Sequence, residues 1–377
     1  MKTLKIYIFI FCICCFGNSY AKDDDPNVII EQMIQEMIFV QKVYDLKIDA
    51  VILQIKLVDN KFNISSSTIE QKVNYLLLKE RLNKQLEQLK NDNVTDISKI
   101  RYIKGLQIIK LLYEKVLSLD HHFASVRTFS EINKISNPNQ YPEFTKMKDL
   151  VKEKRDKKLG FNLTSVLGTN TFASVTQTFI NLFSSSSLSS EEKEKELEKI
   201  ECILDFTLRM HNDLNTIYFE TAYLQASNQN IKTDIETLFR EFTKPISYFA
   251  SLPECRNQDD WDTVNNNLET YIEKMKKAEG TKKFKMQVEL EFPIDRLILF
   301  INQYNAFINE GEKFYQKFSI ILNSYENEKQ CESKLPIEYK KLKDDVDVAI
   351  DKFNIAYKPV EINGTKMKEI LYGLNEY

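Results

Sequence analysis

The chain has 377 residues and a formal net charge of −3, with 52 basic and 55 acidic side chains. Because the two signs are interspersed, the sequence offers no basic footprint for nucleic acid or anionic lipid. Eight glycines and eight prolines are too few for a β-rich or α/β chain of this length, whose turns repeatedly need a positive φ. The composition therefore predicts an all-α protein built from long helices.

Residues 1–21 have the features of a secretory signal peptide. Lys2 and Lys5 precede the apolar run IYIFIFCICCFG, and Ser19-Tyr20-Ala21 is a small-x-small cleavage site. A membrane anchor is the alternative, but the run is shorter than the ~20 apolar residues that span a bilayer, and charged residues follow it at once. We expect a mature chain from residue 22 that is secreted, periplasmic or associated with the cell envelope.

Three long helices and a short one are predicted in the N-terminal helical part, residues 22–158. Apolar residues recur at spacings of three and four over 28–58, after Pro26. Ser67 and Glu70 form a capping box ahead of a second helix to about residue 91, and Asp96 can cap a third to about residue 128. A short helix near 143–158 ends this part.

The C-terminal helical part, residues 191–377, begins behind a second capping box, Ser189 with Glu192. A long helix follows through IECILDFTLRMHNDLNTIYFETAYL, and Trp261 is expected to fix the start of a later one against the bundle. Further helices are predicted near 231–251, 260–278 and 293–327, the last with Pro293 in its first turn. Since each apolar stripe must be buried against another helix, we predict one elongated, coiled-coil-like antiparallel bundle.

One stretch departs from the helical pattern. KFKMQVELEF, residues 283–292, alternates apolar and polar residues, which is typical of a strand. Asn363-Gly364 is a good type I′ turn between VEI and TKM. The sequence thus predicts a small β element at one end of the bundle, formed by 283–292 and a C-terminal hairpin.

Residues 159–190 form a connector that carries no charge and is rich in Ser, Thr and Phe. Within it, residues 171–184 can form a short amphipathic helix. One interpretation is a linker that packs its aromatic face on the bundle; the other is a sheltered segment that inserts into a membrane or grips a partner helix. The candidate membrane or partner face consists of Phe172, Val175, Phe179, Leu182 and Phe183.

This order of elements, an exported helical chain with a neutral aromatic segment between long helices, is similar in outline to the helical pore-forming toxins. It also resembles periplasmic helical adaptors of secretion or conjugation machines. The likeness is one of architecture and includes no shared motif. It implies either membrane insertion through residues 161–188 or adaptor-like binding to another protein.

The remaining cysteines and histidines suggest structural roles. In an oxidising compartment Cys202, Cys255 and Cys331 allow one disulfide and one odd thiol, and Cys255 with Cys331 is the favoured pair because both lie near helix ends. His121 and His122 are adjacent on a helix, where their side chains diverge, so we expect solvated residues near a helix C-terminus rather than metal ligands.

No phosphate loop, G-x-S-x-G, H-E-x-x-H or C-x-x-C sequence occurs in the chain. We therefore expect no enzymatic activity, no cofactor and no metal. The sequence predicts an exported α-helical binding or structural protein, adaptor-like, of the cell envelope, with a protein partner. The alternative is a membrane-active helical protein that inserts residues 161–188.

Overall fold

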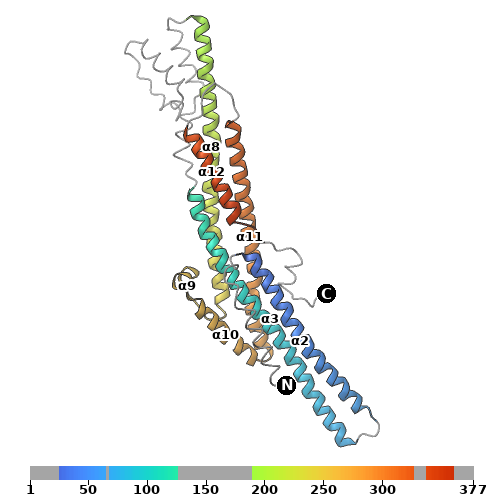
Figure 1. The fold of residues 1–377 in the computed structure, drawn as a ribbon. Helices are drawn as coiled ribbons and strands as arrows, with labels where there is room; N and C mark the ends of the chain where they lie inside the picture. The colour runs from blue at the N-terminus through green and yellow to red at the C-terminus, as the bar shows by residue number, and fades with distance from the viewer. Residues whose placement is uncertain (1–24, 65–67, 126–188, 327–336, 361–377) are drawn as a thin grey trace, which may run out of the picture. The chain divides into compact units, whose positions relative to one another are not determined.

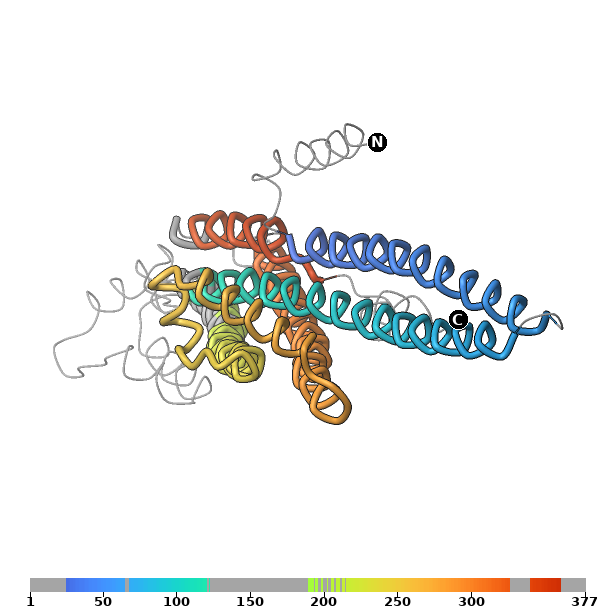
Figure 2. Tube along the Cα trace, turned by 90° about the horizontal axis from the view of Figure 1, so that it is seen from below, coloured from blue at the N-terminus to red at the C-terminus, as the bar shows by residue number. Residues whose placement is uncertain are grey.

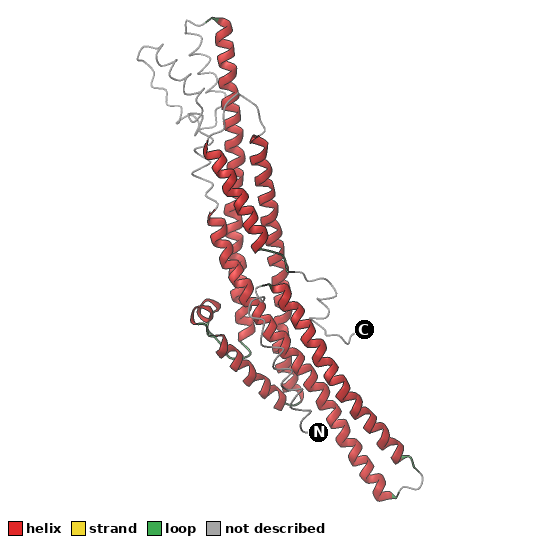
Figure 3. Ribbon diagram, viewed as in Figure 1, coloured by secondary structure: helices red, strands yellow, loops and turns green. Residues whose placement is uncertain are grey.

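The computed structural model describes residues 25–64, 68–125, 189–326 and 337–360. Every regular element in these ranges is an α-helix, which confirms the all-α prediction (Figures 1 and 3). The helices are α2 (Pro26–Phe62), α3 (Ile69–Ser125), α8 (Ser190–Thr243), α9 (Leu252–Gln258), α10 (Trp261–Lys277), α11 (Gly280–Glu326) and α12 (Ile337–Ala356). The bundle arrangement of the whole chain and its domain boundaries stay predictions.

Helix α3 is one continuous helix where the sequence predicted two. Asp96 lies in its middle instead of capping a new helix. Within this polar stretch the hydroxyls of Thr95 and Ser98 donate to the carbonyls of Asn91 and Val94, 2.8 and 2.9 Å away in the same helix. At the start of α3, Thr68 and Gln71 form reciprocal capping contacts at 2.9 and 3.3 Å. Ser67 of the predicted capping box lies outside the described residues.

The capping box predicted at Ser189 and Glu192 is present at the start of α8. The Glu192 carboxylate accepts from the Ser189 amide at 3.1 Å, and the Ser189 hydroxyl accepts from the Glu192 amide at 3.3 Å. Helix α8 then continues for 54 residues and includes the start of the helix predicted at 231–251.

The strand predicted at 283–292 is wrong, because these residues belong to α11. In the helix, Leu290 is buried and Met286 half-buried, four residues apart on one face. Phe284 and Phe292 lie on the other face and remain 68% and 57% exposed. The alternation of apolar and polar residues over 283–292 therefore does not correspond to one buried face. Pro293 lies inside α11 rather than at its start. The hairpin turn Asn363-Gly364 lies outside the described residues.

The chain divides into two compact units, which are considered separately. Unit 1 comprises residues 1–117, 229–306 and 359–377, and unit 2 comprises 118–228 and 307–358. Helices α3, α8 and α11 each contribute one segment to unit 1 and one segment to unit 2.

The core of unit 1 forms where α3 meets the end of α8 and the start of α11. Gly105 of α3 allows a close approach: a Cβ there would lie 2.9 Å from the Phe242 ring and 3.3 Å from Leu297. The Tyr102 hydroxyl donates to the Phe242 carbonyl. As predicted for the start of its helix, Trp261 packs on the core, with its ring 5.9 Å from that of Phe239.

Unit 2 is built around an aromatic cluster. Phe353 of α12 is 1% exposed, and its ring lies 5.2 Å from Tyr315, 5.3 Å from Tyr357 and 5.6 Å from His122. The cluster also closes over Gly311, where a Cβ would lie 2.7 Å from the Phe353 ring. Glycine is therefore needed at this position of α11 for α12 to pack closely.

His122 is not the solvated residue that the sequence predicted. It is half-buried within this cluster, and its Nε2 shares a 2.8 Å hydrogen bond with the Tyr315 hydroxyl. Burial lowers the pKa of His122 below its ordinary value, and the nearby Lys352 ammonium lowers it further. The position of its side chain follows from packing on α12, which a sequence pattern on α3 alone does not reveal.

We expect acid to weaken unit 2 through His122. A histidine whose pKa is lowered by folding binds its proton first in the unfolded chain, so stability falls as pH drops below about 6.5. NMR titration of the three histidines, with the His122 signal assigned by its loss in His122→Gln, should give a pKa below about 6.5. A pKa at or above that value would contradict the buried position.

Candidate interaction surface

The predicted face Phe172, Val175, Phe179, Leu182 and Phe183 lies in 126–188, outside the described residues. The structure therefore does not place it, and a functional surface has to be sought on the described helices.

The predicted Cys255–Cys331 disulfide is not formed, because Cys255 is a free thiol. Cys255 is fully buried in α9 beside Tyr248, and burial raises the pKa of its thiol. It acts as a small buried hydrophobic residue with inert sulfur. Cys331 lies outside the described residues, whereas Cys202 is disulfide-bonded.

Helices α2 and α3 form an antiparallel hairpin within unit 1, seen side by side in Figures 1 and 2. Its outer half, residues 45–62 and 69–94, is called the hairpin end. A narrow seam holds the two helices together: Val51, Val58 and Leu82 are buried there, with Ile55, Tyr75, Leu86 and Leu89 packed around them. Lys79 bonds Asp59 across the seam at 2.6 Å. All members of this core come from the two helices themselves.

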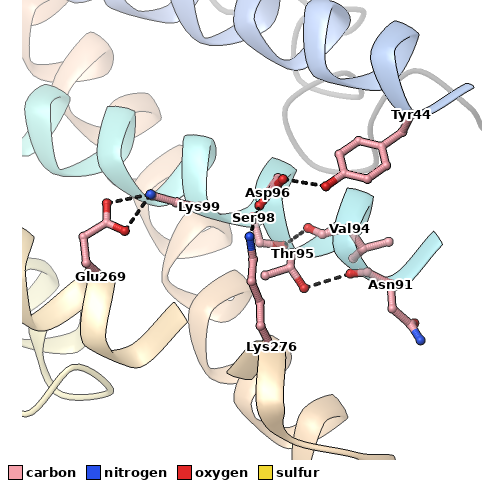
Figure 4. A network of polar contacts seen from close by, with 9 residues as sticks. All are labelled: Tyr44, Asn91, Val94, Thr95, Asp96, Ser98, Lys99, Glu269 and Lys276. Atoms are coloured by element: carbon pink, nitrogen blue, oxygen red, sulfur yellow. Dashed lines mark hydrogen bonds and ion pairs between the residues drawn. The ribbon is translucent and has the colours of Figure 1, made fainter. Parts of the chain in front are cut away.

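A polar network fixes the base of the hairpin (Figure 4). The Tyr44 hydroxyl of α2 donates to Asp96 of α3 at 2.7 Å, and Lys276 of α10 binds the other Asp96 oxygen at 2.8 Å. Lys99 of α3 pairs with Glu269 of α10 at 2.6 Å. Burial, then the Asp96 carboxylate, raises the pKa of Tyr44, so its hydroxyl stays a proton donor. The network therefore holds α3 against both α2 and α10.

Large apolar side chains are concentrated on the outside of the hairpin end. Their exposed fractions run from 43% to 84%. They are Leu46, Leu53 and Leu57 of α2, Ile64 after it, and Ile69, Val73, Leu76, Leu77 and Leu78 of α3. Single exposed leucines are normal, but neighbouring ones on adjacent turns mark an interaction site.

A shallow groove of 510 Å³ lies elsewhere in unit 1, between α8 and α11. Leu238, Leu299 and Phe300 contribute its apolar wall. Arg296 donates to Glu241 at 3.2 Å, and Asp234 is a further charged residue of the lining. The groove therefore offers a mixed surface without a concentration of one charge.

Metal-binding and membrane-spanning features were sought in the same described ranges. No group of three or more His, Cys, Asp and Glu side chains there could hold a metal ion. None of the helices described there is apolar over a length sufficient to cross a bilayer.

Comparison with protein-family models, with curated proteins and with solved structures found no match. The functional inference therefore rests on the hairpin end.

Sequence reasoning missed this surface. The apolar repeat over 28–58 predicts burial against another helix, but Phe39, Leu46 and Leu53 lie outside the stripe that faces α3. The signal in the sequence is that this helix has more apolar residues than one helical face can hold, which indicates a second apolar face.

Proposed function

We propose that the protein is an exported α-helical binding protein, adaptor-like or structural, that acts at the cell envelope without catalysing a reaction. The exposed apolar surface of the hairpin end is the observation that supports this function. Two helices with a narrow core present it on a rigid rod, and the network around Asp96 anchors the base of that rod.

The energetics favour association through this surface. Fully burying a Leu or Ile side chain is worth about 1.5–3 kcal/mol, and at least half of the Leu46, Leu53, Leu57 and Ile69 side chains is still exposed. Covering several of them gives enough free energy to offset a substantial part of the cost of bringing two molecules together. A polar surface of equal area would not supply this free energy of burial.

Capture of a partner tests the proposal. Mature protein immobilised on beads is incubated with an envelope extract of its source, alongside Leu57→Asp/Leu77→Asp, which places charges on the hairpin end. The control, Phe249→Asp/Ile320→Asp, changes two apolar residues elsewhere that are even more exposed, at 80% and 70%. We expect wild type and control to retain a protein that the hairpin variant loses. If no protein is retained specifically, or if the protein instead releases dye from liposomes, the proposal is wrong.

A further inference from the structure

Helix α2 carries two heptad stripes on opposite sides. The inner one faces α3 and includes Tyr44, Val51 and Val58, all buried. The other, called the outer seam, repeats at spacings of 4, 3, 4, 3 and 4, as coiled-coil positions do. It consists of Phe39, Val43, Leu46, Ala50, Leu53 and Leu57.

The outer seam is narrow, and of its six members only Val43 is half-buried while the others are exposed. At 100° per residue its six members fall within an arc of roughly 80°, centred roughly 150° from the inner stripe. Phe39 and Leu46 are 67% and 73% exposed, and Leu53 and Leu57 are 59% and 52% exposed. A regular 4-3 repeat of apolar residues needs a second helix for its burial, and α3 is engaged on the other side.

We propose that the outer seam is a docking site for an acidic amphipathic helix of a partner protein, which packs along α2 as a coiled coil. This inference rests on the proposed binding function and names the chemistry of the partner. The charges beside the seam support an acidic partner, because the residues at the flanking heptad positions decide which helix can pair.

The flanks of the outer seam are basic. Lys42 and Lys56 lie on one side and Lys47 on the other, all exposed, with Asp49 as the acidic residue among them. Lys61 adds a further basic residue at the end of the helix. A partner helix with Glu or Asp at its own flanking positions places opposite charges along both edges, which favours pairing and steers the encounter.

Self-pairing is disfavoured by the same residues. A parallel second copy brings Lys42 of one chain beside Lys47 of the other. An antiparallel copy, with Leu46 packed on Ala50 and Val43 on Leu53, brings the two Lys47 side chains together on one edge and the two Asp49 carboxylates together on the other. Like charges face each other in the parallel pair and in this antiparallel register, which favours a different, acidic chain.

A membrane surface is also a poorer fit than a helix. A helix that lies in a membrane interface needs one broad apolar face opposite a polar one, whereas the apolar residues of α2 are divided between two opposed stripes. The inner stripe is held against α3, so α2 has only its narrow outer seam to offer.

The experiment measures binding of two designed peptides of about three heptads to the full mature chain. Both have Leu at the core positions; one has Glu and the other Lys at the flanks. We expect the acidic peptide to bind about tenfold more tightly by fluorescence anisotropy. Leu46→Asp/Leu53→Asp should abolish binding. Lys42→Glu/Lys47→Glu/Lys56→Glu should reverse the preference toward the basic peptide.

The control is Phe249→Asp/Ile320→Asp, which charges two exposed apolar residues outside the hairpin end and should leave peptide binding unchanged. Circular dichroism and Trp261 fluorescence verify that each variant folds. Equal binding of the two peptides, absence of binding, or binding that survives Leu46→Asp/Leu53→Asp would overturn the inference. Two further results would overturn it. One is a wild-type dimer in sedimentation that Leu46→Asp/Leu53→Asp abolishes, and the other is adsorption to phosphatidylglycerol vesicles that the same substitutions abolish.

Partner capture separates this inference from the proposed function. A protein that wild type retains, and that Leu46→Asp/Leu53→Asp retains equally well, would overturn the outer seam while leaving the binding function intact. Failure of wild type to retain any protein would overturn the binding function itself.

Discussion

Replacing Gly105 by valine is expected to lower the free energy of unfolding of unit 1 by about 2–3 kcal/mol. A Cβ at this position lies 2.9 Å from a Phe242 ring carbon and 3.3 Å from a Leu297 methyl carbon. Both side chains are buried, at 0% and 4% exposure, and the Phe242 ring is 5.2 Å from that of Tyr102. The ring has no space into which to move, and this outweighs the few tenths of a kcal/mol gained by removing a glycine from a helix.

Trp261 is the only tryptophan in the chain and belongs to unit 1, so urea unfolding followed by its fluorescence reports on this unit. Gln107→Val is the control, because Gln107 is exposed on the same helix. Adding Phe242→Leu to Gly105→Val should recover part of the loss, since a smaller side chain makes room. If Gly105→Val and Gln107→Val unfold at the same urea concentration, the close packing of α3 on Phe242 is wrong.

Phe353→Ala is expected to destabilise unit 2 by about 3–5 kcal/mol. The ring is 1% exposed, fills the space over Gly311, and contacts His122, Tyr315 and Tyr357. Truncation removes these contacts and leaves a cavity, because helices held along their length relax only partly.

Hydrogen exchange of the α12 amides measures this effect locally. We expect exchange in α12 to accelerate strongly in Phe353→Ala. Ile355→Ala is the matched control, since Ile355 is on the same helix but 77% exposed, and it should exchange like wild type. Equal protection in the two variants would show that the aromatic cluster does not hold α12.

Much of the fold follows from local patterns in the sequence. The 3–4 repeat over 28–58 gives α2, and the Ser189–Glu192 capping box gives the start of α8. The failures occur where tertiary contacts decide. Residues around Asp96 stay helical because they bond α2 and α10, and 283–292 is helical because Met286 and Leu290 pack on one face of α11.

The candidate site was less accessible from sequence than the fold. A single sequence shows that α2 has apolar residues on two sides, but only the position of α3 shows which side is covered. Phe39 and Tyr44 look alike in a hydropathy pattern, yet one is 67% and the other 9% exposed. The functional surface emerges from this difference.

The most direct test of the account locates the partner on the outer seam. A photoreactive amino acid replaces Leu53 in the mature chain, or Phe249 as a control, and the captured protein is cross-linked on the beads. The account predicts that an acidic helical segment of the partner is joined to position 53 and not to position 249. Cross-linking at position 249 alone, or cross-linking of lipid at position 53, would contradict it.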